Sequence, residues 1–221
     1  DERSLELENE IFNSIRNACK DYIHDLQNVA KVLSEIDMLI ALSIVARSNK
    51  YVRPTFSLYD EMVIENGRHP VIEAMSEKEF IPNHLKLYNN DKILLITGPN
   101  MSGKSTYMRQ NALIVIMAQL GSFVPASMAK LPIFDQIFTR IGSSDDIASG
   151  ESTFMTEMLE VNYALQNATM RSLIILDEVG RGTATFDGMA LAQAIIEYIH
   201  FEIGAKTFFS THYHELTSLE D

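Results

Sequence analysis

Apolar residues recur alternately three and four positions apart in the first part of the chain. Residues 5–47 contain no Pro or Gly, and the repeating positions are Phe12, Ile15, Cys19, Tyr22, Leu26, Val29, Leu33, Ile36 and Ile40. This spacing is typical of a heptad repeat, so it predicts one long helix, or two helices with a slight break. We expect this segment to pack on its own protein, and an intermolecular coiled coil is the alternative.

The pattern changes after Pro54, where short apolar runs begin to alternate with helical stretches. The runs predicted as strands or extended segments are 62–65, 71–74, 85–88, 92–97, 123–126, 136–141, 173–176 and 207–209. The stretches predicted as helices are 105–120, 154–168 and 188–203. Buried strands that alternate with helices favour a three-layer α/β domain with a mostly parallel sheet. We expect two domains, a helical segment over 1–50 and an α/β domain over 51–221.

A phosphate-binding motif follows the run at 92–97. Residues 98–105 read GPNMSGKS and match G-x-x-x-x-G-K-[ST], between a predicted strand and a predicted helix as this motif requires. Glycines let backbone N–H groups approach a phosphate, and the helix N-terminus favours its negative charge. Lys104 is expected to reach the β- and γ-phosphates, and the Ser105 hydroxyl to bind Mg²⁺.

Two adjacent acids, Asp177 and Glu178, end the apolar run LIIL. In P-loop enzymes an acid at this place holds Mg²⁺, so we expect Asp177 on the metal side and Glu178 to polarise the attacking water. This pair favours a hydrolase over a simple kinase. The alternative is that both acids only face solvent at a strand end.

The last predicted strand also ends in polar residues, because TFFSTH closes with Ser210, Thr211 and His212. In a P-loop sheet with an additional strand, the strand end beside the metal-binding strand faces the γ-phosphate. His212 is therefore a candidate γ-phosphate sensor. A structural histidine and a metal pair with His214 are the alternatives, although no third ligand lies at a convincing spacing.

Small polar residues also gather in SGESTFMTE, directly before the helix predicted at 154–168. Ser152 lies 177 − 152 = 25 residues before Asp177. In ABC-type ATPases a small polar signature loop caps a helix at about this position and contacts the γ-phosphate bound by the other subunit. The sequence LSGGQ of transporters is missing, and a plain N-cap is an equally good interpretation of these residues alone.

The composition of the chain argues against several classes of protein. With 18 Lys and Arg against 30 Asp and Glu, the net charge is −12, which argues against this piece being a major nucleic-acid grip by itself. A single Cys excludes an internal disulfide and fits a reducing cytosol. No apolar run approaches the roughly 18–20 residues of a membrane span. The chain begins with Asp1 and ends in SLED, so we expect a fragment of a longer protein.

Four long motifs make the picture specific: TGPNMSGKSTYMRQ, TRIGSSDDIASGESTFMTEM, DEVGRGTATFDGMALAQAI and FFSTHYHELT. Together with GRHPVIE and FIPNHL, they resemble the MutS family of DNA mismatch repair proteins, of the bacterial mismatch-recognition type. The resemblance covers essentially the whole chain. It implies a P-loop NTPase of the ABC type over 51–221, truncated before a C-terminal dimerisation tail. Residues 1–50 resemble the end of the helical lever segment that precedes it.

The resemblance implies an ATPase that takes ATP or ADP with Mg²⁺. The implied nucleotide-binding residues are Phe80, Gly98, Pro99, Asn100, Met101, Ser102, Gly103, Lys104, Ser105 and Thr106. Phe80 stacks on adenine in this family, with an ordinary core Phe as the alternative, and Asn100 approaches the γ-phosphate. The implied catalytic residues are Lys104, Glu178 and His212, and the implied metal ligands are Ser105 and Asp177.

The resemblance also implies partners. Ser152 acts in trans on the nucleotide of a second subunit, which implies a homodimer through the ATPase domains. Residues 180–188 link the two sites, and a Gly-rich turn with Asp187 as a helix cap is the alternative. Mismatched DNA binds through domains missing from this chain, and a MutL-type repair factor acts downstream. The implied location is the cytoplasm, with a role at the nucleoid and no membrane.

The departures from the family pattern are small: Ser102 stands where the family often has a third Gly, Ala184 where it often has Ser, and Pro82 occurs in FIPN. None of them removes a group that the chemistry needs. The recombination-linked MutS-type subfamily ranks lower, because it carries a different phosphate loop. A transporter-type ABC ATPase is disfavoured by the missing LSGGQ and by the short gap between Lys104 and Asp177. A nucleotide-binding module that seldom turns over remains an alternative for the isolated chain.

Overall fold

The computed structural model describes residues 2–99, 101–142 and 153–220. The chain divides into two compact units, Asp1–Ser48 and Asn49–Asp221. In the first unit, α1 (Glu2–Lys20) and α2 (Ile23–Ser48) are separated by a two-residue turn, so the prediction of two helices is confirmed over that of one. A basic residue in the last turn of α1 and an acidic one in the first turn of α2 suit helix ends at this place.

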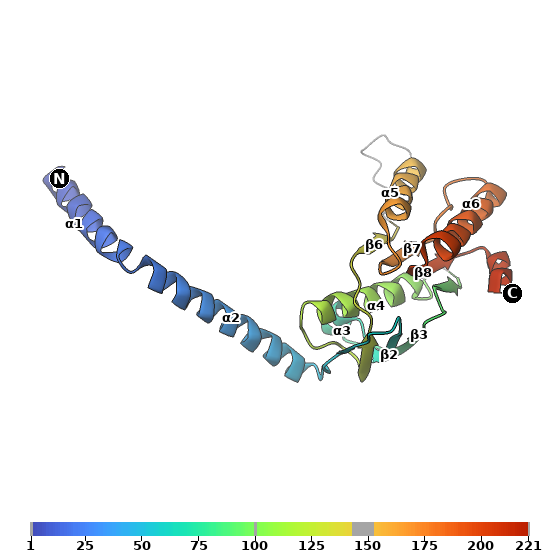
Figure 1. Cartoon of the computed structure of the whole chain (residues 1–221), viewed down its shortest axis with the longest axis horizontal. Helices are drawn as coiled ribbons and strands as arrows, with labels where there is room; N and C mark the ends of the chain where they lie inside the picture. Colours follow the sequence, from blue (N-terminus) through green and yellow to red (C-terminus); the bar gives the residue numbers. More distant parts are fainter. Residues whose placement is uncertain (1, 100, 143–152, 221) are drawn as a thin grey trace. The chain divides into compact units, whose positions relative to one another are not determined.

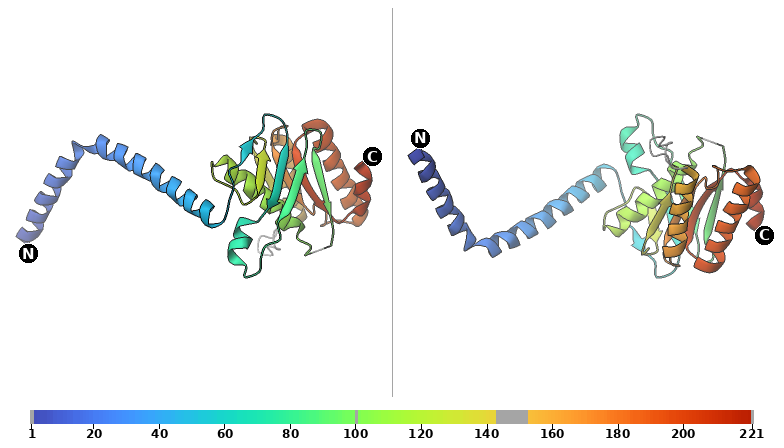
Figure 2. Two further views of the ribbon diagram at one scale, coloured as in Figure 1. Left: turned by 90° about the horizontal axis from the view of Figure 1, so that it is seen from below. Right: turned by 90° about the horizontal axis from the view of Figure 1, so that it is seen from above.

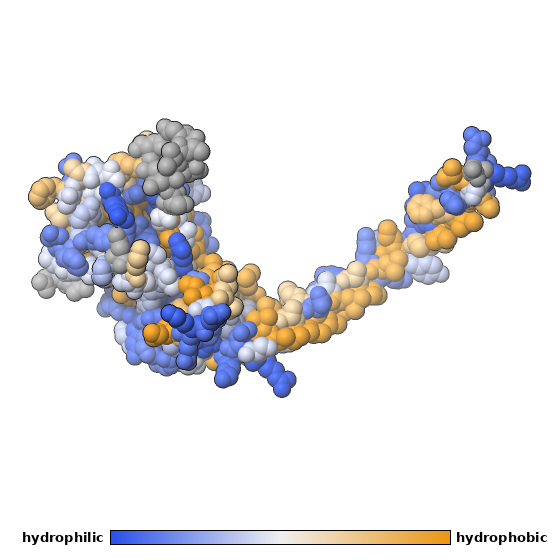
Figure 3. Space-filling model, turned by 180° about the vertical axis from the view of Figure 1, so that it is seen from behind, coloured by the Kyte–Doolittle hydropathy of each residue, from blue (hydrophilic) through white to orange (hydrophobic). Residues whose placement is uncertain are grey.

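The heptad stripe of the first unit is exposed. Every member of it, from Phe12 to Ile40, has an exposed side chain. Figure 3 shows hydrophobic residues running along both helices. No helix within the described residues is long and apolar enough to cross a membrane.

The second unit contains two sheets. A mixed sheet has the order β1-β5-β2-β3, formed by β1 (Thr55–Phe56), β5 (Met128–Leu131), β2 (Met62–Gly67) and β3 (Asn83–Leu87). A wholly parallel sheet has the order β4-β8-β7-β6, formed by β4 (Ile93–Thr97), β8 (Lys206–Thr211), β7 (Leu173–Asp177) and β6 (Ile137–Arg140). The predicted α/β class is confirmed, and the second sheet was not predicted.

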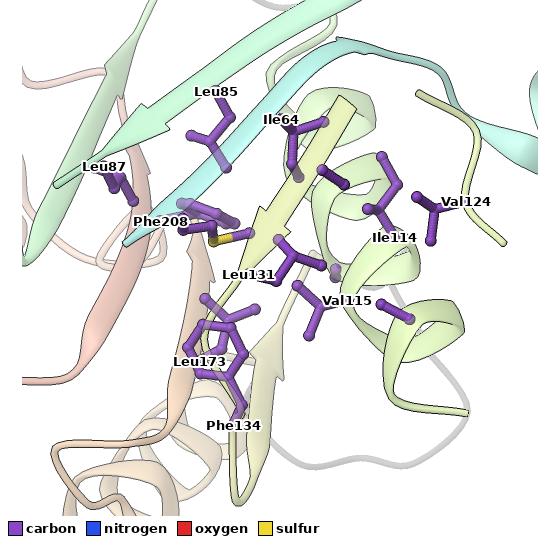
Figure 4. Packing of buried hydrophobic residues seen from close by; sticks show 14 of the residues in the cluster. Ile64, Leu85, Leu87, Ile114, Val115, Val124, Leu131, Phe134, Leu173 and Phe208 are labelled. Atoms are coloured by element: carbon purple, nitrogen blue, oxygen red, sulfur yellow. The ribbon is translucent and has the colours of Figure 1, made fainter. Parts of the chain in front are cut away.

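Helices cover both faces of the parallel sheet (Figures 1 and 2). Helix α4 (Lys104–Gln119) lies between the two sheets, where Ile114 and Val115 pack with residues of the mixed sheet and with Leu173 and Phe208 (Figure 4). Helices α5 (Thr153–Asn167) and α6 (Thr185–Tyr198) pack on the opposite face. Alternate residues of β7 and β8 enter the two clusters, as the period of a strand requires.

Some predicted elements are wrong. The run 71–74 is not a strand but part of α3 (Pro70–Met75), because Pro70 occupies the first helical turn and His69 caps it. His69 Nδ1 accepts the Ile72 N–H at 3.3 Å. The run 123–126 makes only a bridge from Val124 to Val52.

The helix predicted at 188–203 begins earlier, at Thr185, and continues as a π-helix, η1 (Ile199–Ile203). Asp187 therefore lies in the first turn rather than at the cap, which is Ala184. A 3-10 helix, η2 (His214–Glu220), follows β8.

A buried lysine closes the amino end of the parallel sheet. The Lys206 side chain is fully buried at the start of β8, and its Nζ donates to the carbonyls of Tyr88 at 2.6 Å and Asp91 at 2.8 Å. Asp60 Oδ2 lies 3.4 Å from the same ammonium and 2.7 Å from Lys92 Nζ. Burial lowers the pKa of Lys206 despite these partners. The cluster ties the turn before β4 to the strand that lies next to it.

Candidate functional site

Three neighbouring strands of the parallel sheet bring the candidate residues together at their carboxyl ends. In the register of the sheet, Thr97 of β4 lies opposite Thr211 of β8, and Ser210 of β8 lies opposite Asp177 of β7. The loop of residues 98–103 leaves β4, Glu178 follows β7 and His212 follows β8. Crevices at the carboxyl ends of such strands are the usual ligand sites of open α/β sheets.

Glycines shape the loop between β4 and α4. Gly103 is the N-cap of α4 in a left-handed conformation, and a Cβ added there would meet no atom of the described residues within 4 Å. Gly98 also has positive φ, as does Met101. The loop therefore leaves open space directly before the helix N-terminus, where backbone N–H groups can point at an anion.

Lys104, the first residue of α4, turns its ammonium into this loop. Its Nζ donates to the carbonyls of Gly98 at 2.8 Å and Pro99 at 3.1 Å, and the residue is buried. The same Nζ lies 3.5 Å from Glu178 Oε1. The lysine of the loop and the acid of β7 are thus in direct contact, although they are 74 residues apart by 178 − 104.

Glu178 is the meeting point of the charged groups. His212 Nε2 lies 2.7 Å from Glu178 Oε1, and Arg181 Nη1 lies 3.0 Å from Glu178 Oε2. The backbone of Glu178 has φ of 55°, which is strained for a non-glycine residue, and its N–H donates to the carbonyl and hydroxyl of Ser210, both at 3.1 Å. Strained residues of this kind gather at functional sites because the surrounding contacts hold them in place.

Asp177 is buried beside Glu178. Its Oδ1 accepts a hydrogen bond from the Ser210 hydroxyl, which comes from the neighbouring strand. The two adjacent acids therefore differ in their surroundings, because one is held by a hydroxyl inside the sheet and the other faces three basic side chains. The alternative in which both acids only face solvent is not what the structure has.

A cavity of about 610 Å³ extends from the loop toward the segment before β3. Phe80 lines it together with Ser102, Gly103, Lys104 and Thr106. Phe80 is half-buried and lies outside the buried core, so its ring borders open space rather than filling the interior. Ser105 is the second residue of α4.

Two predicted residues, Asn100 and Ser152, lie outside the described residues. Among those that are described, no three His, Cys, Asp or Glu side chains form a group that could hold a metal ion. The alternative of a metal pair at His212 and His214 thus finds no third ligand in the described chain.

Several residues of the site were not assigned from the sequence. Ser210 was noted only as one polar residue at a strand end, and Arg181 had no signal beyond its place after the acids. Glu157 is buried on α5 and accepts the Gly180 N–H at 2.7 Å. The sequence could have pointed to Glu157, because this acid lies on the same helical face as Phe154 and Val161, where an apolar residue is expected.

Known proteins resemble this chain closely. The family model MutS domain V matches residues 94–221. DNA mismatch repair protein MutS of Streptococcus mutans is 62% identical over 219 residues, which are 99% of this chain and 26% of that protein. The proteins of the same name from a Geobacillus species and from Bacillus subtilis are 60% identical over 221 residues and 61% identical over 217 residues. They are matched over 100% and 98% of this chain, and over 26% and 25% of their own lengths.

The chain thus spans about a quarter of the length of the relatives that it matches. The match runs through the loop before α4, the two acids at the end of β7 and the polar end of β8, which the structure brings together in one place. On this match and this arrangement, the chain belongs to the MutS family.

Proposed function

We propose that this chain is the ATP-hydrolysing motor domain of a DNA mismatch repair protein, a P-loop NTPase of the ABC type over residues 51–221. The observation that carries the proposal is the contact of Lys104 with both the loop carbonyls and Glu178. It joins the residue type that binds terminal phosphates to the residue type that activates water. The relatives are all called DNA mismatch repair protein MutS, which supports the biological setting.

ATP fits the open space at the loop. The triphosphate would lie in the cradle of residues 98–106, where the glycines leave room and α4 begins. The base would extend into the cavity toward Phe80, whose ring offers a stacking surface. Asn100 is proposed to approach the γ-phosphate.

The donor set fits Mg²⁺, which usually takes one or two protein oxygens and completes its shell with water and phosphate. Ser105 and Asp177 would hold it, and the ion would neutralise charge on the phosphates. Asp177 is suited to this role because Ser210 already fixes one of its oxygens.

Glu178 is proposed to accept the proton of the attacking water, and His212 to orient the water or sense the γ-phosphate. The two side chains are 2.7 Å apart, so one water can reach both. Arg181 holds the other oxygen of Glu178, which leaves Oε1 on the side of Lys104 and His212. Proton transfer from a positioned base is worth on the order of 10²–10⁴ in rate.

We further propose that the working unit is a homodimer in which Ser152 completes the site of the other subunit. The missing parts of the full-length protein would bind mismatched DNA and engage a MutL-type repair factor. Helices α1 and α2 would carry the state of the ATPase domain to the DNA-binding parts. These proposals rest on family membership, since the chain spans only about a quarter of its relatives.

Turnover of ATP by single variants tests the chemistry. Lys104→Ala should lose ATP binding and turnover together, whereas Glu178→Gln should keep ATP binding and lose kcat on the order of 100-fold. Glu197→Gln is the matched control, because this exposed acid on α6 bonds only Gln193 among the described residues. Unchanged turnover in Lys104→Ala would contradict the proposal.

Mixing tests the composite site. Turnover should rise with the square of protein concentration at low concentration. A mixture of Lys104→Ala and Ser152→Ala proteins should recover part of the activity, because one of the two composite sites is then intact. Turnover that is first order in protein, with no recovery on mixing, would exclude the trans role of Ser152 for this chain.

A further inference from the structure

The backbone N–H and the backbone carbonyl of Gly180 each bond a side chain from a distant part of the chain. Glu157 of α5 accepts the Gly180 N–H at 2.7 Å, and the Tyr213 hydroxyl donates to the Gly180 carbonyl at 3.1 Å. Glu157 is buried and Tyr213 is half-buried, so water competes weakly for these bonds. The two side chains thus fix the backbone of one residue in the loop that follows β7.

Burial, and then the nearby carboxylate of Glu157, raise the pKa of Tyr213. The phenol therefore stays protonated at neutral pH and remains a donor. This matters because a backbone carbonyl can only accept, so the bond to Gly180 requires the proton on the Tyr213 oxygen.

The packing around Gly180 leaves no room for side chains at the glycines of this region. A Cβ added to Gly188, in the first turn of α6, would lie 2.3 Å from both the Gly180 carbonyl oxygen and the Tyr213 hydroxyl. A Cβ added to Gly180 would meet the Gly188 carbonyl at 2.8 Å, and one on Gly182 would meet Phe154 at 3.0 Å. Helix α5, helix α6 and the segment after β8 thus all close on the same loop.

Gly180 lies only two residues after Glu178, so the positions of the two residues are closely linked. Glu178 and Gly180 both have positive φ, and the Glu178 N–H is fixed to Ser210. A shift of the Gly180 peptide must therefore rotate the Glu178 side chain relative to Lys104 and His212. A misplacement of about 1 Å in a catalytic group can cost on the order of 10²-fold in rate.

Glu157 has a second partner, because its Oε2 lies 3.5 Å from Arg140 Nη2 at the end of β6. Arg140 Nε also contacts Glu160 Oε2 at 3.2 Å. Glu160 lies on the same helix and shares the arginine, but its side chain is half exposed and does not bond Gly180. Comparing variants of Glu157 and Glu160 therefore separates the effect of the bond to Gly180 from the effect of the ion pair with Arg140.

We propose that Glu157 and Tyr213 are positioning residues, which clamp the Gly180 peptide and so hold Glu178 at the proper place beside Lys104 and His212. This inference rests on the proposed ATPase function and deepens it. Neither side chain lines the cavity that is proposed to receive the base of ATP. Their effect passes through two hydrogen bonds to one backbone residue.

The test is steady-state ATP hydrolysis by the full-length protein that carries this chain. Glu157→Ala should lower kcat on the order of 10-fold or more and change KM for ATP by less than about twofold. Tyr213→Phe removes only the hydroxyl and should lower kcat by about threefold to tenfold, also with KM retained. Glu160→Ala, which keeps the bond to Gly180, and Tyr163→Phe on the exposed side of α5 should match wild type.

A conservative substitution of Glu157 distinguishes a positioning role from a role in stability alone. Glu157→Gln keeps an oxygen that can accept the Gly180 N–H but loses the ion pair with Arg140, so kcat should return close to wild type. The double variant Glu157→Ala with Tyr213→Phe should lose less than the product of the single losses, because both act on Gly180. A purely structural role would instead lower thermal stability and leave kcat per folded molecule unchanged.

The outcomes are distinct. Wild-type kcat in folded Glu157→Ala and Tyr213→Phe would overturn the clamp, as would a Glu157→Gln protein that is as slow as Glu157→Ala. If Glu157→Ala does not fold, Tyr213→Phe and Glu157→Gln decide. A wild-type protein without ATP hydrolysis, or a Lys104→Ala protein with full activity, would instead overturn the proposed function itself.

Discussion

At the scale of single residues, the site depends on backbone positions that ordinary residues avoid. Among the described non-glycine residues, Lys50, Asn66, Met101 and Glu178 have positive φ, and the last two belong to the candidate site. A left-handed conformation costs about 1–2 kcal/mol at such a residue. At Glu178 this cost is offset by the bonds from its N–H to Ser210 and by the contacts of its carboxylate.

Gly188→Ala is expected to lower the free energy of unfolding by about 1–3 kcal/mol, because the new methyl group would press on the Gly180 carbonyl and the Tyr213 hydroxyl. Urea unfolding of the two proteins measures the difference. Gly121→Ala is unsuitable because of its positive φ, so Gly142→Ala is the control, since a Cβ there meets no atom of the described residues within 4 Å. Equal midpoints for Gly188→Ala and wild type would show that the close approach relaxes without cost.

Lys206→Met should destabilise the chain by about 2–4 kcal/mol, although the new side chain fills much of the same space. The loss arises because the carbonyls of Tyr88 and Asp91 are left without their buried donor. Thermal or urea unfolding would show it. Lys92→Met, which removes a half-buried partner of Asp60 that donates to no buried carbonyl among the described residues, should cost much less. Similar losses for both would argue against a special role for the buried ammonium.

At the scale of elements, the sequence predicts best what local patterns determine. The loop before α4 and the acids after β7 were found because their residues are adjacent in the chain. The strand β5 was missed because it is short and three of its four residues pair with β2, from Val63 to Glu65, across a long separation. The run 71–74 was read as a strand because four residues, VIEA, are too few to show a helical period, and the Pro70 and His69 signals before it were given too little weight.

The cap of α3 makes the stability of this element depend on pH. Burial chiefly lowers the pKa of His69 below its usual 6.5, so the folded state resists protonation. The contribution of His69 to the free energy of unfolding is therefore complete above about pH 6.5 and is lost as the pH falls through the lower pKa of the folded state. Below that range the Nδ1 acceptor for the Ile72 N–H is protonated.

His69→Asn isolates this effect, because Asn caps helices well and does not titrate. Urea midpoints between about pH 7.5 and pH 5 should fall more for wild type than for His69→Asn. An identical pH dependence in the two proteins would show that another group is responsible.

At the scale of the whole molecule, the contacts of the candidate site could not be predicted from the sequence. The bond from Gly180 to Glu157 joins residues 23 positions apart, and that from Tyr213 to Gly180 joins residues 33 apart. Neither pair carries a local signature, since an acid in a helix and a tyrosine after a strand are common. The fold brings them together only when α5, β7 and β8 pack as one sheet with its covering helices.

Two glycines in the middle of α2 test whether the helical unit transmits the state of the proposed ATPase domain. Ala30→Gly with Ser34→Gly should weaken the helix by about 1 kcal/mol at the first position and by about 0.5 kcal/mol at the second. The stimulation of ATP hydrolysis by mismatched DNA in the full-length protein should fall, while basal hydrolysis stays the same. Ser34→Ala keeps the helix and serves as the control, and undiminished stimulation in the glycine variant would exclude the transmission.

The buried lysine at the start of β8 gives the parallel sheet two unlike ends. Lys206, Asp60 and the turn at Tyr88 hold the amino end, while Lys104, Glu178 and His212 gather at the carboxyl end. A protein engineer can therefore strengthen the amino end, one β8 length away from the chemistry, without altering the residues proposed to turn over ATP. Selection, in the same way, can adjust the heat tolerance of such a chain and its turnover rate as separate traits.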